Sequence, residues 1–132
     1  MSSKTIEQMV DELLHLYEEK RRSPFPRTGC RKILRGSGDR YEGLIPDLDL
    51  YFSDIAGYCS WGRKILHWPK EKVQEVKDGL GRSFFEKYPK YKPLEPMITE
   101  SHTPDLHAKL RLYETMRTRL IELLNRILEV NL

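Results

Sequence analysis

The sequence contains little of what a membrane protein or a disulfide-rich domain needs. Its longest stretch without a charged residue runs only from Ile55 to Gly62, whereas a membrane-spanning helix needs about 20 apolar residues. The two cysteines, Cys30 and Cys59, are too few to build a disulfide framework. The first residues also lack the apolar core of a secretory signal. We therefore expect a cytoplasmic protein with reduced thiols and no membrane partner.

Short motifs of the common enzyme classes are also missing. Residues 36–39 lack the Gly-Lys-Ser/Thr of a P-loop, and neither a G-x-S-x-G elbow nor a G-x-G-x-x-G fingerprint occurs. The four histidines and two cysteines do not have the spacing of a zinc site. Asp47, Asp49 and Asp54 lack the glycine and the terminal glutamate of a calcium-binding loop. The sequence accordingly predicts no metal, no cofactor and no catalytic residue.

The two thiols differ in their sequence surroundings. Cys59 falls on an apolar helix face, which is typical of a buried structural cysteine. Cys30 stands close to Arg27 and Arg31, and neighbouring cations lower a thiol pKa. Cys30 is therefore the better candidate for a reactive thiol, although no residue near it in the sequence is identifiable as a base.

What the sequence does contain is helical periodicity, with apolar residues recurring three and four positions apart. Thr5 and Gln8 form a capping box at the first segment, and Thr103 followed by Pro104 has the N-cap pattern of a helix start. Gly79 and Gly81 predict a kink or an end in the third segment. The predicted helices cover about residues 5–22, 46–61, 68–84 and 104–128. We predict an all-α fold, a small four-helix bundle with a long final helix, as one domain over residues 1–132.

Two connections between these helices contain the helix-breaking residues. Residues 23–45 contain two prolines and four glycines, and they predict a basic flap in which residues 35–40 could form the tip of a short β-hairpin. Residues 88–102 contain three prolines and predict an extended connection.

Positive charge is concentrated in one part of the chain. Residues 20–40 have a net charge of +7, whereas the rest of the chain has −4. Guanidinium groups form paired hydrogen bonds with carboxylates and phosphates. The segment therefore predicts binding of an acidic partner, and the alternative is a solvated or internally neutralised surface. The candidate partner-binding or anion-binding residues are Arg21, Arg22, Arg27, Arg31, Lys32, Arg35 and Arg40.

Aromatic residues near the ends of the predicted helices form a second candidate set. Trp61 and Trp68 flank the corner between the second and third helices, and Tyr88 and Tyr91 flank a turn at residues 88–91. Exposed at an end of the bundle, these four side chains would be interface anchors. The alternative is that they belong to the core.

Three classes of function remain open. The leading prediction is a non-enzymatic protein-interaction module, of the inhibitor, immunity or adaptor type, that binds an acidic protein. Nucleic-acid binding through the same arginines is the alternative, although the segment has no helix-turn-helix, zinc-finger or RRM signature. The third class is an all-α enzyme that uses His67 or His102 with a carboxylate. The apolar surface of the last helix is wide enough for a homodimer, so monomer and dimer both remain open.

Overall fold

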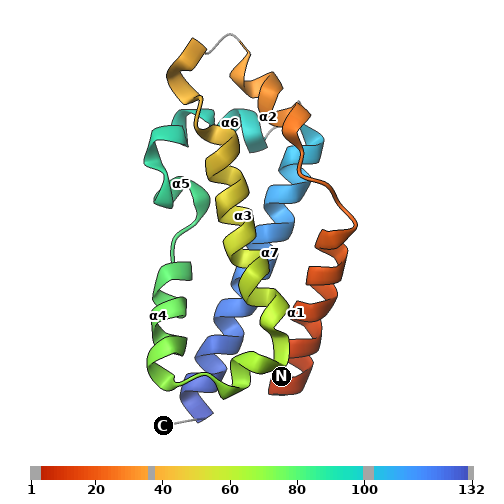
Figure 1. Cartoon of the computed structure of the whole chain (residues 1–132), viewed down its shortest axis with the longest axis vertical. Helices are drawn as coiled ribbons and strands as arrows, with labels where there is room; N and C mark the ends of the chain where they lie inside the picture. Colours follow the sequence, from red (N-terminus) through yellow and green to blue (C-terminus); the bar gives the residue numbers. More distant parts are fainter. Residues whose placement is uncertain (1–3, 36–37, 100–102, 131–132) are drawn as a thin grey trace.

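The computed structural model describes residues 4–35, 38–99 and 103–130 and shows an all-α protein (Figure 1). These residues form seven α-helices and three 3-10 helices, with no β-strand among them. The α-helices are α1 Ile6–Arg21, α2 Arg27–Leu34, α3 Leu44–Trp61, α4 Lys70–Leu80, α5 Phe84–Lys87, α6 Glu95–Thr99 and α7 Pro104–Val130. The 3-10 helices are η1 Gly38–Tyr41, η2 Gly62–His67 and η3 Pro89–Leu94.

The four longest helices, α1, α3, α4 and α7, form the body of the molecule (Figure 1). They run alternately up and down, and α2, α5 and α6 gather toward one end. The long final helix α7 packs against α1, α3 and α4. The prediction of an all-α fold with a long final helix is confirmed. The predicted number of four helices is too low.

Helix boundaries follow the capping chemistry of the sequence. The Gln8 backbone N–H donates to Oγ1 of Thr5, and the Thr5 N–H donates to Oε1 of Gln8, so the predicted capping box starts α1. Helix α7 begins at Pro104, as predicted. Helix α4 ends at Leu80 with Gly81 as its C-cap, so the predicted third helix stops before residue 84.

The prediction of a flap or hairpin in residues 23–45 is wrong in the part that the structure describes. Residues 27–34 form α2, which directs Cys30 and Ile33 into the core. Gly29 allows this packing, because a Cβ there would lie 3.0 Å from Oδ1 of Asp105 and 3.2 Å from Cβ of Leu106 on α7. Part of the predicted hairpin tip, residues 36–37, lies outside the described residues.

The prediction of an extended connection over residues 88–102 is also wrong. Residues 89–94 form η3, and α6 follows directly. Proline restricts φ to a value that the first turn of a helix also requires, so Pro89 at a helix start is compatible with this structure. Residues 100–102 lie outside the described residues.

The core is continuous through the long helices and reaches the short ones. Phe52 of α3 and Tyr113 of α7 stack with ring centroids 4.2 Å apart, and Phe84 stacks on Tyr91 at 5.7 Å. Thr103, which precedes α7, donates its hydroxyl to the carbonyl oxygen of Met97 in α6. These contacts tie the short helices to the body. None of the described helices is long and apolar enough to cross a membrane.

Candidate binding surfaces

Helix α2 presents the predicted basic residues to solvent. Gly29, Cys30 and Ile33 are buried on its inner face, as expected for an amphipathic helix. Its other side, together with η1, carries five exposed cations, which we call the basic surface. The basic surface consists of Arg27, Arg31, Lys32, Arg35 and Arg40.

Three arginines of the basic surface form a column. Arg27, Arg31 and Arg35 follow one another at intervals of four residues, so they share one side of α2 and are spaced by about 6 Å along its axis. Arg27 lies over the Phe25 ring at 5.2 Å, and Arg40 lies over the Tyr41 ring at 5.8 Å. These stacking contacts leave the hydrogen-bonding groups of both guanidinium ions at the surface.

Internal neutralisation of the basic surface is not seen among the described residues. The ion pairs between those residues involve none of its five cations. Arg21 and Arg22, at the end of α1, precede α2 and are not part of this surface. Arg21 pairs with Glu18 on its own helix at 3.3 Å.

Cys30 is not the reactive thiol that its basic neighbours suggested. Its side chain is fully buried on the inner face of α2. Burial, with a smaller effect from Asp105, raises the pKa of Cys30 to about 11, and the opposing effect of Arg27 does not compensate. Cys59 is also buried, and burial raises its pKa to about 12. Both thiols are therefore structural.

A groove of about 820 Å³ lies between α3 and α4. Both helices pack on α7 far more extensively than on each other, which leaves room for the groove. Buried apolar side chains, including Ile55 and Val76, line it together with Tyr58. Charged side chains also line this groove: Asp54, Glu71, Lys72, Glu75, Arg82, Lys87 and Arg117.

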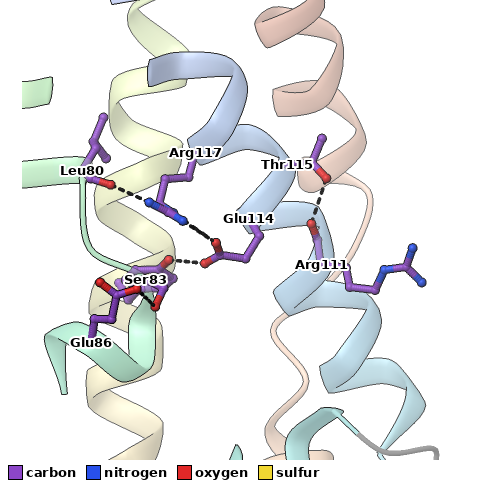
Figure 2. Close-up of polar contacts among 8 residues, drawn as sticks. Leu80, Ser83, Glu86, Arg111, Glu114, Thr115 and Arg117 are labelled. Carbon is purple, nitrogen blue, oxygen red and sulfur yellow. Dashed lines mark hydrogen bonds and ion pairs between the residues drawn. The ribbon is translucent and has the colours of Figure 1, made fainter. Parts of the chain in front are cut away.

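A polar network forms one wall of the groove and links three helices (Figure 2). Glu114 of α7 accepts hydrogen bonds from the hydroxyl of Tyr51 in α3 and from Nε and Nη2 of Arg117, the latter two at 3.1 and 2.8 Å. Nη1 of Arg117 donates to the carbonyl oxygen of Leu80, the last residue of α4, at 2.7 Å. Burial and the hydrogen bond to Glu114 raise the pKa of Tyr51, which keeps it neutral.

Sequence reasoning missed this network. Glu114 and Arg117 interrupt the apolar stripe of the last helix, and two charges three positions apart are usually read as a solvated pair. Their side chains are only 34% and 17% exposed. The signal that could have found them is the position of Arg117 within the apolar stripe, because a buried guanidinium needs several acceptors.

The four predicted interface aromatics are separated by the fold. Trp61 is 47% exposed, and Trp68 is half-buried against it with ring centroids 6.4 Å apart. Tyr91 is completely buried and donates its hydroxyl to Asp47, so the prediction that it is an exposed anchor is wrong. Tyr88 is half-buried beside it. The tryptophan corner joins α3 to α4, whereas the tyrosines follow α5.

The tryptophan corner is shaped by one glycine. Gly62 ends α3 with φ of 49°, a left-handed conformation that disfavours other residues. A Cβ there would also approach Cδ2 of Leu14 to 2.8 Å. Lys72 lies over the Trp68 ring at 4.6 Å, which brings this corner next to the groove that Lys72 lines.

The histidines do not assemble into a site in the described part of the chain. His67 is exposed at the end of η2, and His102 lies outside the described residues. Within residues 4–35, 38–99 and 103–130, no three His, Cys, Asp or Glu side chains are grouped closely enough to hold a metal ion.

Comparisons with known proteins place the chain in a family. No curated protein and no solved structure matches the sequence. The sequence profile of a family described as YxiJ-like protein matches residues 11–121, which includes the described parts of α2 to α6 and most of α1 and α7. The protein therefore belongs to the YxiJ-like family.

Proposed function

We propose that this protein is a non-enzymatic interaction module that binds an acidic protein partner through the basic surface. The observation that carries the proposal is the column of Arg27, Arg31 and Arg35, whose charges have no ion-pair partner among the described residues. The helical backbone of α2, with Arg35 as its C-cap, already holds the three residues in one arrangement, so little backbone order has to be created on binding. Carboxylates on a partner would replace the missing counter-charges.

The residues that neighbour the arginines of the basic surface favour a protein partner over a nucleic acid. Single-stranded nucleic acid is bound by exposed aromatic rings, but Tyr41 is buried and Phe25 is half-buried beneath Arg27. Asn, Gln and Arg are the residues that commonly read duplex bases, and α2 offers only Arg among them. Carboxylate recognition requires only the guanidinium column.

The proposal is tested by removing the column. The variant Arg27→Gln/Arg31→Gln/Arg35→Gln and the control Lys70→Gln/Lys92→Gln/Arg111→Gln each lose three exposed positive charges. Exposed substitutions of this kind change stability by about 0.5 kcal/mol or less, so both variants should fold. The binding protein is first captured from a lysate of the source cells treated with nuclease, and it is then purified for kinetic measurements.

We expect the captured protein to associate with the column variant about tenfold more slowly at low salt, with a weaker salt dependence than for the native chain. The control variant should associate at the native rate. Equal association of both variants would contradict the proposal. Loss of all captured material on nuclease treatment, together with retention of duplex DNA at about 100 mM salt, would establish the nucleic-acid alternative.

A further inference from the structure

We propose that the groove between α3 and α4 is a second docking site and that it takes an amphipathic helical segment of a partner protein. The shape of this region gives the first argument. Helices α3 and α4 both pack on α7 (Figure 1), and a hollow of about 820 Å³ lies between them. A helix laid in a groove of this kind buries its apolar face against both walls.

The chemistry of the groove matches such an occupant. Ile55, Val76 and Leu80 form an apolar floor that is itself 1–7% exposed, and the partly exposed Tyr58 ring adds to it, so an occupant would contact them with apolar side chains repeated at three-residue and four-residue intervals. Helix α4 is 11 residues long, so the groove beside it extends for about 16 Å. A segment of about four helical turns covers that distance with its ends exposed.

The charges of the groove give the occupant a direction. At the end where α4 stops, Arg82 has no ion-pair partner among the described residues, and Lys87 pairs with Asp54 only at 3.9 Å. Arg117 uses three of its five N–H groups in the contacts to Glu114 and Leu80, which leaves two. This end of the groove therefore suits acidic side chains.

The opposite end of the groove has the opposite character. Glu71 and Glu75 line it near the start of α4. The cation at this end, Lys72, lies over the Trp68 ring. Complementarity therefore requires an occupant with acidic residues toward Arg82 and basic residues toward Glu71.

Gly79 keeps the groove open near the end of α4. A Cβ at this position would meet no atom within 4 Å, so the packing of this chain does not require a glycine there. Glycine in a helix costs up to about 1 kcal/mol relative to alanine. A docked helix would use the space above Gly79, because the absence of a side chain lets another backbone approach closely.

The groove and the basic surface are separate, so the two proposals can fail independently. Helix α2 lies at one end of the molecule and α4 lies toward the other (Figure 1). The variant Gly79→Phe adds a ring at a position that lines the groove and where a Cβ would meet no atom within 4 Å. Gly57→Phe is the matched control, because Gly57 is a helical glycine of α3 with equally open space and does not line the groove.

The test selects displayed random peptides of about 15 residues, the length of four helical turns, on the full chain. We expect enriched peptides with apolar residues at helical spacing, acidic residues at one end and basic residues at the other. Gly79→Phe and Arg82→Glu should weaken their binding about tenfold or more. Gly57→Phe and Arg27→Gln/Arg31→Gln/Arg35→Gln should change it by less than about twofold.

Four outcomes would overturn the proposal. These are the absence of any enriched peptide, enrichment of peptides without the amphipathic pattern, and equal binding to the native chain and Gly79→Phe. The fourth is a dimer, found by sedimentation, that Gly79→Phe dissociates, because the occupant would then be a second copy of this chain. None of these outcomes bears on the acidic partner proposed for α2.

Discussion

Lys109 is 4% exposed, and its ammonium group is held by backbone oxygens at the end of α1. It donates to the carbonyl oxygen of Ser23 and lies 3.5 Å from that of Lys20. It also lies over the Tyr113 ring at 5.6 Å. Burial and the nearby Lys20 charge lower the pKa of Lys109. The Ser23 oxygen lies just beyond α1, and the Lys20 oxygen also accepts from the Ser23 N–H, so Lys109 adds a charged donor to the end of α1.

We expect Lys109→Met to lower the free energy of unfolding by about 1–3 kcal/mol, because both carbonyl groups lose a charged donor in a buried place. Urea unfolding followed by circular dichroism measures this change. The control Lys70→Met removes an exposed lysine and should change the free energy by about 0.5 kcal/mol or less. Equal losses in the two variants would show that the Lys109 contacts do not stabilise the fold.

At the scale of the element, the network of Tyr51, Glu114 and Arg117 determines where α4 ends against α7. The Leu80 carbonyl group is one of those that a helix leaves unsatisfied at its C-terminus, and Arg117 satisfies it from a neighbouring helix. Arg117→Met would leave this oxygen without its donor and Glu114 with Tyr51 alone. We expect a loss of about 1–3 kcal/mol in the free energy of unfolding, measured by denaturant titration.

The matched control for this prediction is on the same helix. Arg119 pairs with Glu122 at 3.3 Å with the same spacing of three residues, but both side chains are more exposed. Arg119→Met should therefore cost less than about 0.5 kcal/mol. If Arg117→Met lowers the free energy of unfolding no more than Arg119→Met does, the hydrogen bond from Arg117 to Leu80 does not stabilise the fold.

The elements that the sequence predicts well are those whose signals are local. The Thr5 capping box, the start of α7 at Pro104 and the end of α4 near Gly81 each depend on neighbouring residues. Helix α2 was missed because its inner face is short and contains Gly29, which weakens the helical pattern. Its stability depends on packing against α7, and contacts with residues far along the chain leave no periodic signal.

The candidate binding surfaces also contain some features that local sequence signals predict and others that depend on the assembled fold. The basic residues were visible as a charge run, but their arrangement as a column required α2 to be a helix. Trp61 is exposed, whereas Tyr91 is buried because its hydroxyl has the acceptor Asp47 inside the fold. The groove was not predictable, since it depends on how α3 and α4 are placed against α7. Such a placement is a property of the assembled fold.

At the scale of the whole molecule, buried acids with raised pKa values predict instability at alkaline pH. An unfolded thiol ionises near pH 9.0, whereas the folded pKa values are about 11 for Cys30 and about 12 for Cys59. Below pH 9 the thiols stay protonated in both states, and the free energy of unfolding does not depend on them. As the pH rises from 9 toward the folded pKa values, the thiols ionise only in the unfolded state, so the free energy of unfolding decreases. The raised pKa values of Tyr51, Tyr91 and Tyr113 add to the loss above pH 10.

We expect the free energy of unfolding to decrease between pH 9 and pH 10, with each thiol contributing at most about 1.4 kcal/mol per pH unit. Lys109 acts in the opposite direction, because its lowered folded pKa makes unfolding bind a proton below pH 10.5. Denaturant titrations at a series of pH values measure the slope. The variant Cys30→Ala/Cys59→Ala should have a shallower slope, and an unchanged slope would contradict the assignment.

The position of α7 also has a consequence for biosynthesis. Every long helix that α7 packs against precedes it in the chain, and α1 is separated from it by the whole of α2 to α6. At about 5–20 residues per second, a ribosome takes several seconds to proceed from the end of α1 to the start of α7. During that interval the apolar side chains of Val10 and Leu13 have no α7 to pack against. The nascent chain therefore keeps this apolar face of α1 without its α7 cover until α7 has emerged.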